Sequence, residues 1–260
     1  MAPTESVRKA ARLDGRVALI TGSGAGMGRA HAILMAERGA GIVVQDINGK
    51  GAEETAEQVR KRGARVEVIV RDVTDIAQMQ RDIRAAETRM GSIDILVNNA
   101  GIDDNRPIEG YDEATFQRVF DVHVKGSFFA AQAVVPGMKA RKRGKIINIS
   151  SIWGMTAHSS DSVYCGAKAA LLGLTKAWAK ELAPWNIHVN AICPGGVVTA
   201  MAMDGEGMAA IARKAQDVPL KRYAEPVEIA YAVAFLASGE ADFITGQALS
   251  PNGGQVIVGI

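Results

Sequence analysis

Three residues in the second half of the chain have the chemistry of proton transfer: Ser151, Tyr164 and Lys168. Tyr164 and Lys168 lie four residues apart in SVYCGAKAALLGLTKAWAKEL, which predicts a helix with both side chains on one face. A free tyrosine has a pKa of about 10, and a neighbouring ammonium should lower it toward the range of efficient proton transfer. Ser151 ends the apolar run KIINIS and could offer a hydroxyl to a substrate oxygen. The Tyr-x-x-x-Lys pair alone is weak evidence, since many such pairs are a solvated helix face.

The elements that must position these residues alternate along the chain. Short runs rich in Val and Ile predict strands at 16–21, 41–46, 66–70, 93–98, 145–150 and 187–192. Helices are predicted between them, ending at Arg38 and covering about 50–62, 75–90, 113–142 and 162–183. This alternation predicts an α/β fold, a doubly wound parallel sheet flanked by helices (Rossmann fold). We expect a single domain over 1–260, with a loose leader at 1–13 and a mobile substrate lid at about 195–215.

A glycine-rich turn directly follows the first predicted strand, in TGSGAGMG (21–28). Gly22 permits the tight turn, while Gly26 and Gly28 let the backbone approach a pyrophosphate at the following helix N-terminus. The spacing differs from the G-x-G-x-x-G fingerprint of other dinucleotide-binding proteins.

Acidic and amide residues end the next three predicted strands. Asp46 could accept both ribose hydroxyls of an adenosine and would repel a 2′-phosphate, and neither Ser23 nor Ile47 supplies a cation for one. The sequence therefore predicts NAD rather than NADP, although an ordinary strand-end aspartate is the alternative. Asp72-Val73 and the NNAG run (98–101) would lie at the same carboxyl edge of the sheet, where ligands bind in open α/β folds.

Composition excludes several classes of function. The 260 residues carry a formal net charge of +2, so neither a nucleic-acid footprint nor an acidic tail is present. The basic run KARKRGK (139–145) is interpreted as a solvated helix end. Cys165 and Cys193 form no CxxC pair or metal cluster, which favours free thiols in a reducing compartment and no metal. Without an apolar signal segment or a membrane-length apolar run, we expect a cytoplasmic protein with no nucleic-acid or membrane partner.

Taken together, these motifs resemble the short-chain dehydrogenase/reductases. TGSGAGMG, Asp72, NNAG, Ser151, YCGAK (164–168) and PGGVVT (194–199) occur in that family's order and spacing, and the match runs from about Leu13 to ITGQALSPNGG (244–254). The resemblance implies that Tyr164 is the acid/base, that Ser151 holds the substrate oxygen, and that Lys168 binds the nicotinamide ribose and lowers the tyrosine pKa. It also implies a set of cofactor-binding residues: Gly22, Ser23, Gly26, Met27, Gly28, Asp46, Ile47, Asp72, Val73, Asn99, Ala100, Gly101, Tyr164, Lys168, Pro194, Gly195, Val197 and Thr199.

Two positions depart from the family pattern. The family's fourth catalytic residue is an asparagine in a D-V-N-x-x-G run, and here that run reads Asp121-Val-His-Val-Lys-Gly126. His123 could join the proton path if it titrates near neutrality, or it could be a packed, hydrogen-bonded histidine. Asn252 replaces the usual aspartate of DGG, which affects a turn or an interface contact rather than the chemistry.

The resemblance implies an NAD-dependent oxidoreductase that interconverts a secondary alcohol and a ketone. A 3-oxoacyl-thioester reductase is the alternative enzyme, and a cofactor-binding sensor without catalysis is the alternative of another class.

The substrate pocket would include Trp153, His158 and Met201, the last in a methionine-rich segment that could equally be a plain surface helix. The family implies a homotetramer, and the apolar tail QVIVGI (255–260) would suit a subunit contact.

Overall fold

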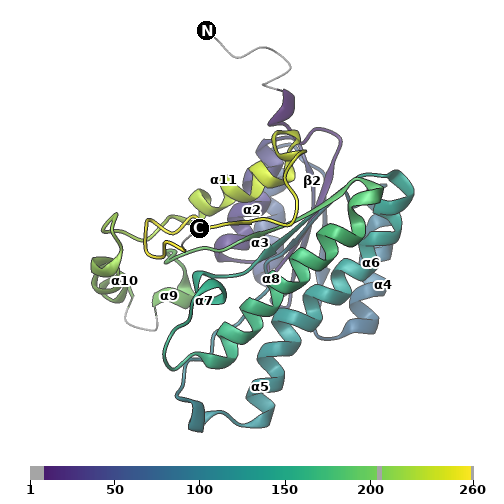
Figure 1. Cartoon of the computed structure of the whole chain (residues 1–260). Coiled ribbons are helices and arrows are strands. Elements are labelled where there is room, and N and C mark those ends of the chain that lie inside the picture. Colours follow the sequence, from purple (N-terminus) through teal and green to yellow (C-terminus); the bar gives the residue numbers. More distant parts are fainter. Residues whose placement is uncertain (1–8, 204–206, 259–260) are drawn as a thin grey trace.

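The computed structural model describes residues 9–203 and 207–258, and its centre is one seven-stranded parallel sheet (Figure 1). The strand order is β3-β2-β1-β4-β5-β6-β7, so the order reverses between β1 and β4. In chain order the strands are β1 (Val17–Thr21), β2 (Gly41–Asp46), β3 (Val66–Val70), β4 (Ile95–Asn98), β5 (Gly144–Ile149), β6 (Ile187–Ile192) and β7 (Ala248–Leu249). The six strands expected from the sequence all occur, and the seventh has only two residues.

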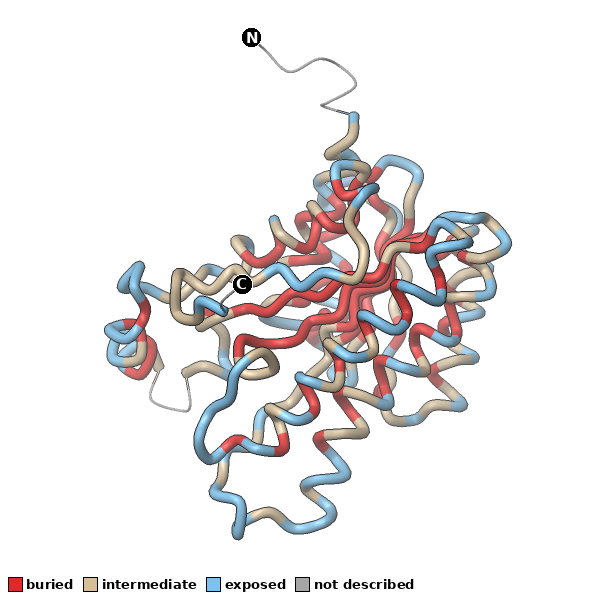
Figure 2. Tube along the Cα trace, viewed as in Figure 1, coloured by how far each residue is buried: buried red, intermediate tan, exposed pale blue. Residues whose placement is uncertain are grey.

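Helices cover both faces of the sheet (Figure 1). One layer contains α2 (Gly26–Glu37), α3 (Gly49–Arg60) and α11 (Pro226–Ala237), and the other contains α4 (Ile76–Met90), α6 (Gly126–Arg141) and α8 (Ser162–Leu182). Side chains alternate between the two cores along each strand: Ala18 and Ile20 pack toward the first layer, Val17 and Leu19 toward the second. Figure 2 shows the resulting buried sheet between half-exposed helices. The predicted doubly wound fold is confirmed.

The helices α3 and α4 begin at polar side chains that cap them. Asn48 accepts a hydrogen bond from the Gly51 N–H at the start of α3, and Asp75 accepts one from the Gln78 N–H at the start of α4. Gly91 ends α4 in the left-handed conformation (φ 87°), which glycine adopts without strain.

The predicted helix over 113–142 is interrupted. It consists of α5 (Glu113–Phe120), a π-helical turn (Asp121–Lys125) and α6. The π-helical turn contains His123, and the Ser127 hydroxyl donates to the His123 carbonyl at 2.6 Å. Such single π turns inside α-helices are frequent at functional sites.

Leu13, the last residue of the predicted leader, belongs to the packed core. Leu13, assigned to the loose leader over 1–13, is fully buried in the core beside α2, and its N–H donates to the Arg38 carbonyl at 2.8 Å. The packed chain therefore includes Leu13, while residues 1–8 lie outside the described ranges.

A buried carboxylate joins strands at the amino edge of the sheet. Asp94, fully buried, accepts hydrogen bonds from the Val17 N–H (3.0 Å) and the Ser92 hydroxyl (2.7 Å). The guanidinium of Arg143 also forms an ion pair with the Asp94 carboxylate, at an N–O distance of 2.8 Å. These contacts satisfy the charge that burial would otherwise penalise.

Candidate active site

A cleft of about 870 Å³ lies along the carboxyl edge of the sheet. Its volume is within the range of small-molecule and cofactor sites. Every residue predicted from the sequence to be catalytic, cofactor-binding or substrate-binding lines it, with the exception of Ser23. The topology explains this convergence, because the carboxyl ends of parallel strands meet at one edge where the strand order reverses.

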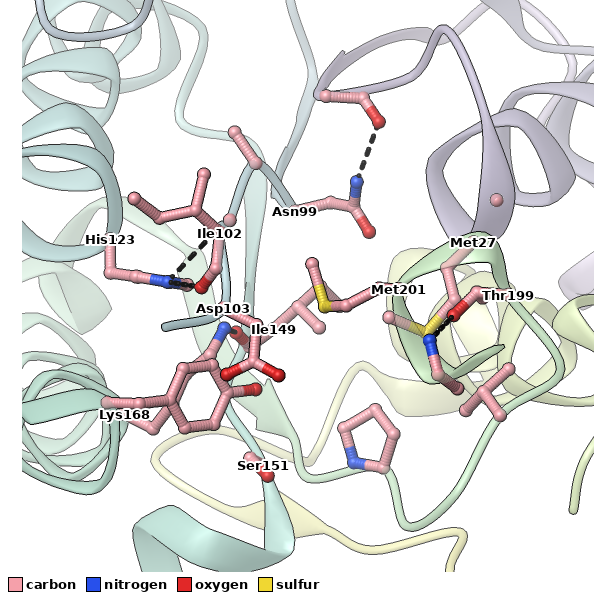
Figure 3. A pocket seen from close by; sticks show the side chains of 18 of the residues that line it. Met27, Asn99, Ile102, Asp103, His123, Ile149, Ser151, Lys168, Thr199 and Met201 are labelled. Atoms are coloured by element: carbon pink, nitrogen blue, oxygen red, sulfur yellow. Dashed lines mark hydrogen bonds between the residues drawn. The ribbon is translucent and has the colours of Figure 1, made fainter. Parts of the chain in front are cut away.

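Ser151, Tyr164 and Lys168 all line the cleft, and Figure 3 shows Ser151 and Lys168 at one end of it. Ser151 follows β5 and caps the short helix α7 (Ile152–Met155), with its hydroxyl oxygen accepting the Trp153 N–H at 3.1 Å. Tyr164 and Lys168 come from the first two turns of α8. The Lys168 ammonium donates to the Ile149 carbonyl at 2.8 Å and lies 5.4 Å from the centre of the Tyr164 ring.

The charge environment of Tyr164 differs from the sequence prediction. Burial raises the pKa of Tyr164, and the carboxylates of Asp103 and Asp161 act in the same direction, while the Ser151 side chain opposes them. Lys168 is itself buried, which lowers its pKa to about 8. Its ammonium is directed at the strand carbonyl.

His123 packs between the NNAG loop and Tyr164. Its Nε2 lies 2.8 Å from the Ile102 carbonyl oxygen and 3.2 Å from the Ile102 nitrogen (Figure 3). Its ring meets the Tyr164 ring edge to face, with 5.4 Å between centroids. Burial lowers the pKa of His123 to about 3. These observations favour the packed, neutral histidine over one that titrates near neutrality.

The glycine-rich turn forms the opposite wall of the cleft. Gly26, Met27 and Gly28 begin α2, and the helix has no side-chain cap, so its first N–H groups are available to an anion. A Cβ on Gly28 would lie 2.2 Å from the Gly22 carbonyl oxygen, so only glycine fits this close approach.

The NNAG loop binds this turn directly. The Asn99 side-chain amide donates to the Thr21 and Gly22 carbonyls at 2.9 and 3.0 Å. Its Oδ1 is buried and has no partner among the described residues. Asn99 therefore fixes the turn and leaves one acceptor at the cleft.

Asp46 ends β2 beside the glycine-rich turn. Its two carboxylate oxygens accept the Gly24 N–H and the Asn48 N–H, both at 2.8 Å. Ser23, which the resemblance places among the cofactor-binding residues, does not line the cleft. It is fully buried, and its hydroxyl donates to the Ile20 carbonyl at 2.8 Å and accepts the Gln45 N–H at 3.1 Å. The Ser23 side chain thus links β1 to β2.

Two arginines that the sequence analysis did not single out lie near Asp72. Hydrogen bonds from Thr74 and an ion pair of 3.0 Å with Arg118 outweigh the effect of burial and lower the pKa of Asp72. Arg71 follows β3, lines the cleft beside Asp46, and forms an ion pair with Asp82 at 3.0 Å. Neither arginine belongs to a recognisable motif, so only the fold reveals their position.

The C-terminal segment supports the turn after β6. The Gly196 N–H donates to the Gln255 side chain at 3.1 Å. Asn252 donates from its amide nitrogen to the Ser250 hydroxyl and to the Val256 carbonyl, both at 2.8 Å. The amide replacing the family's aspartate therefore holds a turn.

The residues predicted to contact substrate all follow Ser151 in the chain, and all line the cleft. The rings of Trp153 and His158 are 4.8 Å apart, and Met201 comes from α9 (Ala200–Met203). The predicted lid over 195–215 also includes α10 (Met208–Lys214) and residues 204–206, which lie outside the described ranges.

Asp103 and Asp161 are further carboxylates at this end of the cleft. Sequence motifs assign a role to neither: Asp103 is one of several polar residues after NNAG, and SSDSVY gives Asp161 the pattern of an ordinary helix cap.

The described residues contain neither a helix suited to a membrane nor a cluster suited to a metal ion. None of the helices in the described ranges has the length and apolarity that crossing a membrane requires. Within the same ranges, no three His, Cys, Asp or Glu side chains gather closely enough to hold a metal ion.

Comparisons with known proteins agree with this geometry. A family model described as enoyl-(acyl carrier protein) reductase matches residues 22–255. The 3-oxoacyl-[acyl-carrier-protein] reductase FabG of Thermotoga maritima is 37% identical over 248 residues, covering 95% of this chain and 100% of that protein.

Solved structures are similar over nearly their whole length. Gluconate 5-dehydrogenase from Burkholderia cenocepacia, in complex with NADP and tartrate, has a TM-score of 0.90 at 37% identity, covering 96% of this chain and 98% of that one. A 7α-hydroxysteroid dehydrogenase complexed with NADH and 7-oxo glycochenodeoxycholic acid has a TM-score of 0.91 at 34% identity, covering 97% and 98%. The chain belongs to the short-chain dehydrogenase/reductase family, as its motifs predicted, and is an oxidoreductase acting on CH–OH groups.

Proposed function

We propose that this protein is an NAD-preferring oxidoreductase that interconverts a secondary alcohol and a ketone. The observation that carries the proposal is the convergence of Ser151, Tyr164 and Lys168 at one end of a cleft whose other wall is the glycine-rich turn. The cleft fits a nicotinamide dinucleotide: α2 begins without a cap, Asn99 has a free buried acceptor, and Asp46 ends β2.

In this proposal, each catalytic side chain has one task. The Tyr164 oxygen takes the hydroxyl proton during oxidation and returns it to the ketone oxygen during reduction. The Ser151 hydroxyl donates a hydrogen bond to the same substrate oxygen and stabilises its developing charge. Lys168 places a positive charge beside the Tyr164 ring, and His123 holds that ring edge to face. NAD, when bound, supplies the hydride acceptor or donor.

Tyr164→Phe tests the assignment. Removal of one hydroxyl should lower kcat at least 100-fold on the best substrate of a secondary-alcohol and ketone panel, because general acid–base catalysis contributes about 10²–10⁴-fold. NADH absorbance measures turnover, and NADH fluorescence measures binding of the cofactor, which should persist. Near-full turnover by the variant contradicts the assignment. Cofactor binding without turnover of any panel member by the wild type would instead support the sensor function.

The preference for NAD rests on Asp46. Its carboxylate would accept ribose hydroxyls and repel a 2′-phosphate. Asp46→Asn removes the charge and keeps one acceptor oxygen, so only one of the Gly24 and Asn48 N–H groups retains its hydrogen bond to this side chain. We expect the ratio of kcat/KM for NAD to that for NADP to fall at least tenfold in this variant. A wild-type ratio below one would contradict the preference.

Arg71 favours a second candidate, an NADP-dependent 3-oxoacyl-thioester reductase like the named Thermotoga maritima relative. Arg71 lines the cleft, and its backbone N–H donates to the Asp46 carbonyl, so its guanidinium could meet a 2′-phosphate if it left its ion pair with Asp82. Rapid reduction of an acetoacetyl thioester with NADPH, lost on Arg71→Gln, would select this candidate.

A further inference from the structure

Asp161 precedes α8 but does not cap it. Aspartate is a favoured capping residue, because its carboxylate usually accepts an N–H from the first turn. Here the side chain makes no such hydrogen bond. The Asp161 backbone carbonyl accepts the Cys165 N–H at 2.9 Å, as in a regular helix. The carboxylate is therefore not used by the helix it introduces.

The carboxylate of Asp161 is nevertheless buried at the cleft. The residue is only 4% exposed, its Oδ1 has no partner among the described residues, and it lines the same cavity as Tyr164. A buried carboxylate oxygen without a donor is unfavourable, so the position calls for a donor from outside the chain. Asp161 lies three residues before Tyr164, which places it within reach of a substrate held by that tyrosine.

The surroundings of Asp161 are acidic. Figure 3 shows Asp103 in the same part of the cleft as Ser151 and Lys168. Burial raises the pKa of Asp161 to about 7, and electrostatic repulsion by Asp103 and Asp104 acts in the same direction. Asp104 is paired with Arg106 at 2.7 Å, and the Tyr111 hydroxyl donates to the Asp104 backbone at 2.6 Å. Lys168 donates to the Ile149 carbonyl.

We propose, building on the function above, that Asp161 with Asp103 beside it determines substrate specificity. This acidic subsite accepts a hydrogen-bond donor, a hydroxyl or an ammonium, carried next to the reacting carbinol, and it disfavours a substrate with a carboxylate there. The preferred substrates are vicinal diols or amino alcohols. A donor group satisfies the Asp161 oxygen, whereas an added anion would lie beside two carboxylates.

Four matched alcohols test the subsite: cyclohexanol, trans-cyclohexane-1,2-diol, trans-2-aminocyclohexanol and 2-hydroxycyclohexanecarboxylate. At pH 8.5 we expect the wild type to show kcat/KM at least tenfold higher for a donor-bearing alcohol than for cyclohexanol, and at least tenfold lower for the carboxylate. Asp161→Ala should reduce both ratios to within threefold of one. Because ratios between substrates are compared, a partial loss of folded enzyme cancels.

Asp161→Asn distinguishes the two donors. The amide still accepts a hydrogen bond but carries no charge, so preference for the diol should survive it and preference for the amine should not. Asp75→Asn is the matched control, since Asp75 is an exposed cap of α4 that does bind its helix and does not line the cleft. It changes the net charge equally and should leave all ratios unaltered.

Failure of this inference and failure of the proposed function give different results. Unchanged ratios in Asp161→Ala, or a wild type that prefers the carboxylate, overturn the subsite while turnover continues. Absence of turnover for every alcohol overturns the proposed function instead. In that case calorimetric titration of the wild type and Asp161→Ala with trans-2-aminocyclohexanol decides the subsite, because at least tenfold weaker binding by the variant is required.

Discussion

At the scale of single residues, burial shifts the pKa values of the groups in the site toward their uncharged forms. The phenol of Tyr164 has a raised pKa and so carries its proton at neutral pH, as a group that protonates a ketone oxygen must. The Lys168 pKa is lowered to about 8 by the same desolvation. Alcohol oxidation needs Tyr164 as the phenolate, which accepts the proton of the alcohol. We therefore expect the rate of alcohol oxidation to increase with pH.

His123 should make the protein sensitive to acid. Its pKa falls from the ordinary 6.5 to about 3 in the folded protein. Between pH 3 and pH 6.5 the imidazole is therefore protonated in the unfolded chain but neutral in the folded protein. Its contribution to stability is complete above pH 6.5 and is lost as the pH falls toward 3. The cost is about 1.4 kcal/mol per pH unit for one histidine.

His123→Asn should reduce the slope of unfolding free energy against pH by up to that amount. Urea denaturation at pH 4.5, 5.5 and 6.5 measures the slope. His31 remains in the variant as a second contributor, because it is fully buried with a pKa also lowered to about 3. Equal slopes for the two proteins would show that His123 is not buried as a neutral group.

At the scale of elements, the loop after β4 and the π-helical turn fit each other closely. A Cβ on Gly101 would lie 2.6 Å from the Cε1 of His123. The glycine and the histidine are thus matched across two segments that sequence analysis treats separately.

Gly101→Ala should destabilise the protein by about 1–3 kcal/mol through this overlap, and His123→Ala in the same chain should recover most of the loss. Urea unfolding of both single variants and the double variant gives the coupling energy. Gly173→Ala is the control, since nothing lies within 4 Å of the added carbon in α8, and the change should be neutral or stabilising. Additive effects at Gly101 and His123 would contradict the contact.

Elements with a strong period or composition were predictable from the sequence. The Val- and Ile-rich strands β1 to β6 appear within two residues of their predicted ends. The helix α11 was not predicted, because PVEIAYAVAFLA is apolar on nearly every face and has little amphipathic contrast. The π-helical turn was hidden for a different reason: its His123 makes a tertiary contact with Ile102, which no local pattern announces.

At the scale of the whole molecule, the fold explains why motifs predicted the site and missed its acidic side. Glycines, Asn99 and the Tyr164–Lys168 pair occur in local patterns that can be read along the chain. Asp161 has the local pattern of a cap, and only the packing of α8 against the cleft shows that it does not act as one. Ser23 is the opposite case, since a motif position proved to point into the sheet.

Assembly is the prediction that belongs to this scale. The family resemblance implies a homotetramer, and apolar side chains stay uncovered in the described chain, including Phe243, which is fully exposed, and Ile257, which is 87% exposed. Light scattering after size exclusion should give about four times the chain mass of 27.5 kDa. A mass of one chain would contradict this expectation.

The buried Asp94 lies at the edge of the sheet opposite the cleft, and this separation has a practical consequence for engineering. The ionic cluster that secures the strands is remote from the loops that face substrate, so the two can be altered independently. Libraries for new substrate preferences can therefore randomise 103–106, 153–161 and 200–203 independently of any change at the opposite rim. Stabilising changes made at that rim should broaden the mutations such libraries tolerate.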